Sequence, residues 1–349
     1  MFFQEQVPFR ANGPQAFKLP SLSLPKGGGA IRGMGETFAE NPVTGTVRFT
    51  VPISISPGRD DFAPQLVLSY DSGSGQGPFG FGWNLDLPAI TRKTDNGLPQ
   101  YLDESESDVF LLSGSEDLVP VHLSDGTKFC DDVTVAGYRI HRYHPRIEGS
   151  FARIERWTRL NDGDVHWRVF SKDDILTIYG LTSDSRIADP DNPQRIYSWL
   201  ICESRDHKGN AILYEYKAEN GSHVDLTLAC EQNRGDRSSR RRSANRYLKR
   251  IFYGNRKPLL DEDGRRPRFL TDGQRNPADW LFQVVFDYGE HDAAQPRPVE
   301  SGEWPCRPDP FSTYRPGFEV RTYRLCRRVL MFHHFPDEPG VGADCLVRS

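Results

Sequence analysis

Hydrophobic and polar residues alternate one by one along much of the chain, which is the pattern of half-buried β-strands. In residues 46–56, TVRFTVPISIS, every second residue is apolar from Val47 to Ile55, and most of the residues between them are polar. Pro52 interrupts this segment and has no N–H to donate to a neighbouring strand. We therefore expect the strand to lie at a sheet edge or to carry a bulge.

Further segments rich in Val, Ile, Phe, Tyr and Trp follow, separated by turn signals such as Asn-Gly and Asp-Gly. The strands predicted from these segments are residues 65–70, 108–113, 116–123, 150–157, 165–171, 175–180, 195–204, 210–218, 224–229, 246–254, 280–288 and 318–334. The clearest turns are Asn96-Gly97, Asp125-Gly126, Asp162-Gly163 and Lys208-Gly209-Asn210. Helical templates match poorly over twelve or more residues, so the predicted class is mostly β with few helices and long loops.

The composition agrees with this class and suggests one large domain. Hydrophobic residues make up 37% and aromatic residues 11% of the 349 residues, with 31 Gly and 26 Pro, which is typical of short strands joined by loops. Residues 1–20 are predicted to be a flexible tail and residues 21–349 a single domain. The strand pattern still runs at ADCLVRS, so we expect the domain to continue past Ser349.

The net charge of −4 gives no general attraction to nucleic acid or to an anionic membrane. No apolar stretch approaches the ~18 residues that span a bilayer. The N-terminus, MFFQEQVPFR, lacks the basic and apolar regions of a Sec-type signal. We therefore expect neither nucleic-acid binding nor direct membrane insertion, and export, if it occurs, by another route.

Six scattered cysteines contain no CxxC pair and no zinc-finger spacing, and they are too few for a disulfide scaffold. We expect buried or half-buried reduced thiols. The cysteines are Cys130, Cys202, Cys230, Cys306, Cys326 and Cys345.

One glycine cluster has the spacing GxGxxG of dinucleotide-binding loops, at Gly75, Gly77 and Gly80. That motif requires a helix after the last glycine, and the following residues, FGWNLDLP, cannot form one of useful length. The run Gly27–Gly29 lacks the Lys-Ser/Thr of a phosphate loop. We interpret both segments as backbone corners, so no cofactor site is predicted.

Two further patterns resemble catalytic or metal-binding spacings. Glu104 and Glu106 have the Glu-x-Glu spacing of ADP-ribosyltransferases, but they sit in an acidic loop without the matching upstream strand signature. The histidine pairs His141/His144 and His333/His334 lack a third and fourth ligand. Adjacent strand residues point to opposite faces, so His333 and His334 are poor joint ligands. No catalytic or metal-binding residue is assigned, and the protein is predicted not to be an enzyme.

The segment from Arg234 to Arg250 is the one strongly basic stretch, and it includes the run Arg240–Arg242. It could bind phosphates or an acidic partner surface. Because no aromatic residues are interleaved and the chain is acidic overall, a solvated loop is the favoured interpretation.

Long ordered strings also resemble the SpvB/TcdB N-terminal family, which contains B components of tripartite insecticidal toxin complexes and the N-terminal half of a virulence-plasmid toxin. The similarity runs over roughly residues 20–349. It is carried by residues 24–46, 51–101, 115–121, 175–190, 195–220, 245–255 and 318–336. Asp206, Gly209 and Asn210, followed by Tyr214 and Tyr216, also resemble one unit of tyrosine-aspartate (RHS/YD) repeats.

The resemblance implies curved or spiralling antiparallel sheets that form part of a hollow β-shell. In the family, the B and C components build this shell around the toxic C-terminal region of the C component, and a propeller of the B component docks on the pore-forming A component. The propeller is not visible in this chain, and no catalytic residue carries over. The expected role is a structural, secreted toxin subunit without a classical signal peptide, cytoplasmic before release.

Two other functions remain open. The chain could be the translocation half of a mono-ADP-ribosyltransferase toxin whose catalytic domain is absent here. It could also be an adhesin that binds glycans through exposed aromatic residues such as Trp83 and Trp157.

Overall fold

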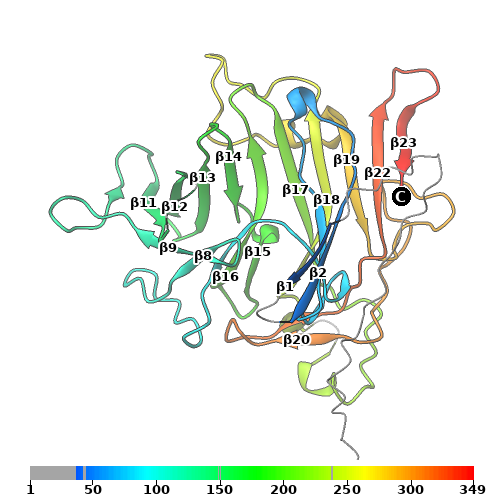
Figure 1. Cartoon of the computed structure of the whole chain (residues 1–349), viewed down its shortest axis with the longest axis horizontal. Helices are drawn as coiled ribbons and strands as arrows, with labels where there is room; N and C mark the ends of the chain where they lie inside the picture. Colours follow the sequence, from blue (N-terminus) through cyan, green and yellow to red (C-terminus); the bar gives the residue numbers. More distant parts are fainter. Residues whose placement is uncertain (1–36, 42–44, 148, 150, 237–238) are drawn as a thin grey trace, which may run out of the picture. The chain divides into compact units, whose positions relative to one another are not determined.

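The computed structural model describes residues 37–41, 45–147, 149, 151–236 and 239–349, and these residues build antiparallel β-sheets (Figure 1). The predicted mostly-β class, with extended antiparallel sheets and few helices, is confirmed. No helix among these residues has the length and apolar character needed to cross a membrane. The helices described are 3-10 segments of three residues: η1 Arg59–Asp61, η2 Ser183–Ser185, η3 Gln232–Arg234, η4 Arg240–Arg242, η5 Gly273–Arg275 and η6 Pro277–Asp279.

Part of the largest sheet closes on itself to form a ring of eight strands, on the left in Figure 1. Both β7 and β14 pair with the long strand β16, and these pairings close the ring. β10 (Cys130–Asp131) and β15 (Arg186–Asp189) add to its margins. The ring strands are β7 (Ala89–Arg92), β8 (Phe110–Leu112), β9 (Glu116–Pro120), β11 (Tyr138–Pro145), β12 (Arg153–Arg159), β13 (Val165–Phe170), β14 (Leu176–Tyr179) and β16 (Asn192–Arg205).

The same sheet continues from β16 into five more strands, which we call the extension, on the right in Figure 1. A separate hairpin, β20 (Phe311–Thr313) with β21 (Val320–Thr322), lies in the connection to β22. The extension strands are β17 (Ala211–Ala218), β18 (Arg246–Asn255), β19 (Trp280–Asp287), β22 (Arg328–Phe335) and β23 (Gly342–Arg348).

A small four-stranded sheet, in the order β1-β2-β3-β6, precedes the ring. β2 pairs with β1 on one side and β3 on the other, so the prediction that its proline marks a sheet edge or a bulge is wrong. Pro52 ends β2 two residues beyond the last pair with β1, so its missing N–H leaves no gap in that pairing. The strands of this sheet are β1 (Thr37–Asn41), β2 (Thr46–Pro52), β3 (Val67–Asp71) and β6 (Trp83–Leu85). Strands β4 (Gln76–Gly77) and β5 (Gly80–Phe81) form a separate two-stranded hairpin.

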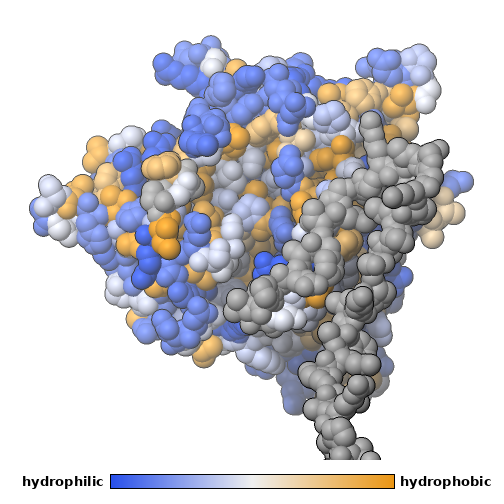
Figure 2. All heavy atoms as spheres, viewed as in Figure 1, coloured by the Kyte–Doolittle hydropathy of each residue, from blue (hydrophilic) through white to orange (hydrophobic). Residues whose placement is uncertain are grey.

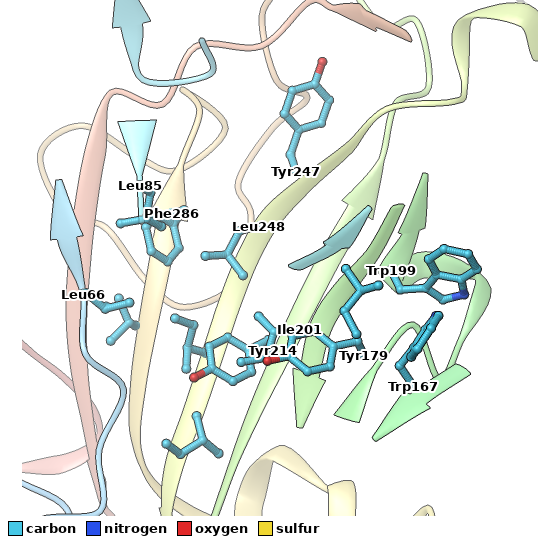
Figure 3. Packing of buried hydrophobic residues seen from close by; sticks show 14 of the residues in the cluster. Leu66, Leu85, Trp167, Tyr179, Trp199, Ile201, Tyr214, Tyr247, Leu248 and Phe286 are labelled. Carbon is cyan, nitrogen blue, oxygen red and sulfur yellow. The ribbon is translucent and has the colours of Figure 1, made fainter. Parts of the chain in front are cut away.

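One hydrophobic cluster joins the three parts (Figure 3). Trp167 and Trp199 pack edge to face inside the ring, with ring centroids 5.9 Å apart. Leu66 and Leu85 from the segment of the small sheet belong to the same cluster as Phe286 of the extension. Large side chains buried in this way stabilise a fold by roughly 1.5–3 kcal/mol each, so a few aromatic residues support a sheet of modest apolar content.

Two predicted strands differ from the structure. Residues 224–229 form turns, because the Asp225 carboxylate accepts hydrogen bonds from the backbone N–H of Thr227 (2.9 Å) and from its hydroxyl (2.7 Å). Residues 318–334 divide into β21 and β22 instead of one strand. The predicted tail, residues 1–20, and the run Gly27–Gly29 lie outside the described residues.

Candidate functional site

The turn between β16 and β17 has the local structure that its repeat-like sequence suggests. Asp206 accepts hydrogen bonds from the backbone N–H groups of Lys208 (2.9 Å) and Asn210 (2.8 Å), and Gly209 has a φ of +84°. Asn255 at the end of β18 donates to the Gly209 carbonyl at 2.9 Å and accepts from Ala211. This hairpin is therefore attached to the next strand by side chains.

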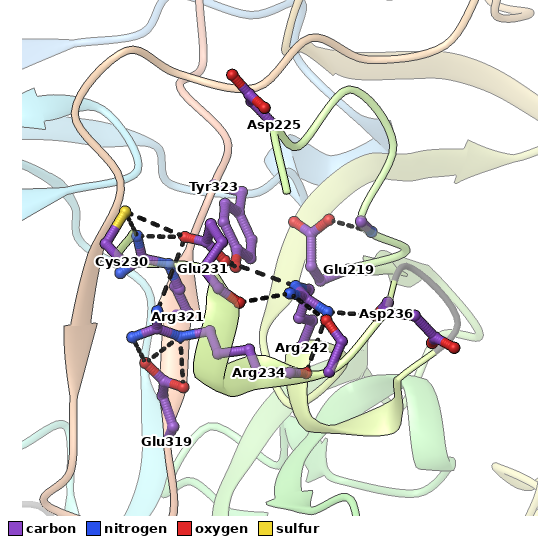
Figure 4. A network of polar contacts seen from close by, with 12 residues as sticks. Glu219, Asp225, Cys230, Glu231, Arg234, Asp236, Arg242, Glu319, Arg321 and Tyr323 are labelled. Carbon is purple, nitrogen blue, oxygen red and sulfur yellow. Dashed lines mark hydrogen bonds and ion pairs between the residues drawn. The ribbon is translucent and has the colours of Figure 1, made fainter. Parts of the chain in front are cut away.

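The basic stretch is folded around one buried carboxylate, that of Glu231, which is 1% exposed (Figure 4). Arg321 lies 2.6 Å and Arg242 3.6 Å from its oxygens, and the Tyr323 hydroxyl donates to it. Arg234 lies 3.9 Å from the same carboxylate. One acid thus gathers three guanidinium groups, which we call the Glu231 cluster.

These contacts contradict the interpretation of the whole stretch as a solvated loop. Arg242 is 2% exposed and donates to the carbonyl oxygens of Arg234 (3.1 Å) and Gly235 (2.9 Å). Arg234 forms a bidentate pair with Glu319, with its closest contact at 2.6 Å. Charge composition did not distinguish these arginines from exposed neighbours, because Glu319 lies 85 residues from Arg234 and the carbonyl groups that bind Arg242 are brought together only by the fold of the loop.

A second polar cluster, which the sequence analysis missed, lies at the end of β19. Asp287, Glu290 and His291 are buried, and one ligand atom from each lies within 4.8 Å of the others, a spacing that could hold a metal ion. Two cationic side chains already contact the group: Lys249 bonds Glu290 and lies 2.8 Å from His291 Nε2, and Arg328 Nε donates to Asp287 at 2.8 Å. The arrangement is thus a set of ion pairs.

The glycine cluster at residues 75–80 forms the hairpin β4–β5, followed by strand β6. It lacks the helix that dinucleotide binding requires. Gly82, just after the cluster, has a φ of +77°, and a Cβ there would lie 2.5 Å from the Tyr70 ring. The predicted backbone corner with close approach is therefore present at Gly82.

Glu104 is exposed, while Glu106 is half-buried and paired with Lys128 at 2.9 Å. The Tyr143 hydroxyl donates to Glu106 at 3.3 Å. These contacts give Glu106 a role in the ring structure. Both carboxylates line a pocket of about 530 Å³, which also includes Arg156.

Arg156 is 4% exposed, points into the ring, and has no ion pair among the residues that the structure describes. Its Nε and Nη1 atoms also lack hydrogen-bond partners there. His141, its cross-strand neighbour, is half-buried, and burial, together with the charge of Arg156, lowers its pKa. His144 is exposed on the other face of the same strand.

His333 and His334 point to opposite faces of β22, as predicted. His333 Nε2 lies 2.7 Å from the Ser56 hydroxyl, and His334 Nε2 lies 3.0 Å from Gln283. Trp157 is 5% exposed and Trp83 is half-buried, so neither is the exposed glycan platform that the adhesin hypothesis requires.

All six cysteines are free thiols. Cys202 is buried, and burial raises its pKa to about 12. Cys306, Cys326 and Cys345 are half-buried, but Cys130 and Cys230 are exposed, so the expected burial is wrong for these two.

Sequence and structure comparisons relate this chain to the same group of proteins. Three relatives named mono(ADP-ribosyl)transferase SpvB, from Salmonella choleraesuis, Salmonella typhimurium and Salmonella dublin, are each 42% identical over 93% of this chain. The chain spans about half, 52%, of the length of these curated relatives. The solved N-terminal domain of effector protein SpvB from Salmonella typhimurium strain LT2 matches with a TM-score of 0.73 and 42% identity, over 85% of this chain and 91% of that domain.

Larger assemblies contain the same fold. The crystal structure of TcdB2-TccC3 matches 95% of this chain with a TM-score of 0.77 and 35% identity, and the match occupies 16% of that protein. The Tc holotoxin pore of Photorhabdus luminescens gives a TM-score of 0.75 at 35% identity, over 96% of this chain and 15% of that one. The family model described as Salmonella virulence plasmid 65kDa B protein matches residues 41–335. The chain therefore belongs to the SpvB family.

Proposed function

We propose that this chain is a structural subunit of a bacterial toxin complex. It would form part of a β-shell that encloses the toxic C-terminal region of a partner C component, without catalysis of its own. The observation that carries this proposal is the match to TcdB2-TccC3 over 95% of the chain. The chain would act outside the producing cell after export without a classical signal peptide, and a propeller beyond these residues would dock on the A-component pore.

The chemistry of the described residues supports a structural role. The most buried acids in the polar clusters, Glu231, Asp287 and Glu290, each contact arginine or lysine side chains of the same chain. Loss of one partner from a buried pair is strongly destabilising, as expected for groups that hold the fold together. Figure 2 shows hydrophobic and hydrophilic residues interspersed over one face, which suits a wall that contacts different surfaces along its length.

Co-expression of the full-length protein with its C-type partner, an RHS-repeat protein with a toxic C-terminal region, tests the proposal. We expect a stable binary complex on size exclusion, in which the toxic region resists a protease that digests it when the partner is expressed alone. Separate elution of the two proteins, or equal digestion in both samples, would contradict the shell role.

A second candidate is the translocation half of a mono-ADP-ribosyltransferase toxin. It is favoured by the 42% identity to proteins that carry that name and that are about twice as long as the matched region. The reading frame after Ser349 separates the two functions. A propeller with RHS repeats supports the shell subunit, and a module with an Arg…Ser-Thr-Ser…Glu-x-Glu pattern supports the transferase.

A further inference from the structure

A pocket of about 510 Å³ lies on the outer face of the ring, between strands β11–β14 and the loop of residues 261–268. In β12 and β13 the side chains of Ile154 and Trp167 point into the hydrophobic core. Strand side chains alternate between faces, so Glu155 and Arg168, which are opposite each other in these strands, point outward into this pocket.

Arginine dominates the lining of this pocket, although the chain as a whole is acidic. Six arginines line it, against three acidic residues. The sheet supplies Arg142, Arg153 and Arg168, the loop supplies Arg265, Arg266 and Arg268, and the acids are Asp131, Glu155 and Asp261.

Half of these arginines already contact an acid. Arg142 and Arg153 share Glu155, at 3.5 and 3.2 Å, and Arg266 pairs with Asp174 at 3.0 Å. Asp131 and Asp261, the other acids of the lining, accept hydrogen bonds from backbone N–H groups of their own turns.

The remaining three arginines have little compensation. Arg265 is 4.0 Å from Asp263, and both side chains are exposed, so this pair contributes little. Arg168 and Arg268 have no ion pair within the described part of the chain. Three guanidinium groups therefore line the pocket without a close ion pair of their own.

Arg168 is the buried member, at 2% exposure. Its guanidinium lies between the rings of Trp157 and Phe269, 3.9 and 4.5 Å from their centroids, and its Nε donates to His166 Nε2 at 3.2 Å. Its Nη2 has no hydrogen-bond partner among the described residues. Burial, with the nearby charge of Arg205, lowers the pKa of Arg168 to about 10. A bound anion would offset the free-energy cost of burying the Arg168 charge.

We propose that this pocket binds a phosphate-bearing small molecule, with the phosphate held by Arg168, Arg265 and Arg268. Planar guanidinium groups bind phosphate oxygens in pairs, and three of them match the two or more negative charges of such a ligand. The volume lies within the ~300–1,000 Å³ range of small-molecule sites and exceeds what one phosphate fills. The phosphate group is the recognised chemistry, either as a free polyphosphate or as a phosphate ester.

Isothermal titration of the whole 349-residue chain tests the site, with inorganic pyrophosphate representing the free anion and glucose 6-phosphate the ester. We expect saturable 1:1 binding of at least one probe, weaker at higher salt. The double variant Arg265→Gln/Arg268→Gln should raise Kd at least tenfold, and Arg168→Met should abolish binding. The control Arg240→Gln/Arg241→Gln removes two exposed arginines outside the pocket and should leave Kd unchanged.

Heats that do not saturate with either probe, or the same Kd in the pocket and control variants, would overturn the proposal. Binding of sulfate as tightly as pyrophosphate at equal ionic strength would show a nonspecific anion patch and would also overturn it. The double variant changes only exposed side chains, so it decides the outcome even if Arg168→Met unfolds the protein.

Discussion

The Glu231 cluster and the outer pocket of the ring both concentrate arginine, yet they treat its charge in opposite ways. In the cluster, one acid that is 1% exposed contacts three guanidinium groups. In the pocket, the guanidinium of Arg168 is 2% exposed and forms no ion pair with any described residue. The comparison shows that the density of basic residues in the sequence does not tell which of them are neutralised.

The position of the arginines in the sequence suggests the opposite distribution of paired and unpaired charge. The contiguous basic stretch could bind phosphates or an acidic partner, but half-buried Arg234 and buried Arg242 are satisfied by Glu319, Glu231 and backbone carbonyl groups. The arginines without a close ion pair are Arg168 on strand β13 and Arg265 and Arg268 on a loop that is distant from β13 in sequence. Pairing depends on which side chains the sheet brings together.

The largest expected effect is a loss of stability in the Glu231 cluster, where the arginine charges are paired. Glu231→Gln removes the acid of the cluster and leaves the buried charges of Arg242 and Arg321 without it, so we expect the free energy of unfolding to fall by about 3–5 kcal/mol. Urea denaturation followed by tryptophan fluorescence measures it. Glu104→Gln, an exposed carboxylate in the ring, is the matched control and should change stability by less than about 0.5 kcal/mol. A small change in stability for Glu231→Gln would contradict this prediction and would mean that water solvates the arginine side chains of the cluster.

The next largest effect is a dependence of stability on pH that arises from His166, the neighbour of Arg168. Burial and the adjacent Arg168 hold the pKa of His166 well below its usual value. Below pH ~6.5, His166 therefore binds a proton in the unfolded chain but stays neutral in the folded chain. The stability that neutral His166 contributes is complete above that pH and is lost as the pH falls below it. The slope is at most about 1.4 kcal/mol per pH unit for this group.

His166→Gln keeps an acceptor for Arg168 and removes the titration, so its unfolding free energy should depend less on pH between 4 and 6.5 than that of the parent chain. Because burial also lowers the pKa of His141, His291 and His333, part of the dependence should remain. His122→Gln, an exposed control, should follow the parent curve. Parallel curves for His166→Gln and the parent would contradict the assignment.

The smallest effect extends the comparison to the inside of the ring. Arg156 is a buried cation without an ion pair in the described ranges, so Arg156→Met should be neutral or raise the free energy of unfolding by about 1 kcal/mol. Thermal denaturation in a buffer free of multivalent anions measures this change. A marked loss of stability would contradict this prediction and would mean that the charge of Arg156 is stabilised in the folded protein.

Much of the fold could be predicted because its signals are local. The β-branched and aromatic residues of segments 65–70, 165–171 and 280–288 mark strands β3, β13 and β19, and the glycine of each predicted turn has a positive φ, as at Gly126 and Gly163. The strand predicted at residues 224–229 was wrong because the Asp225 side chain favours a turn there. Candidate chemistry was harder to predict, since Glu231 and Asp287 belong to no recognisable motif.

What the sequence determined by itself was strand content, turn positions and membership of the family, because alternation, glycine conformation and long matching strings are properties of neighbouring residues. Only the tertiary structure decided that β16 closes a ring by pairing with both β7 and β14, and which charges are neutralised. Arg234 and Glu319 are 85 residues apart in the chain, and Tyr323 is 92 residues from Glu231. Contacts over such separations depend on the register of the whole sheet, which no local pattern specifies.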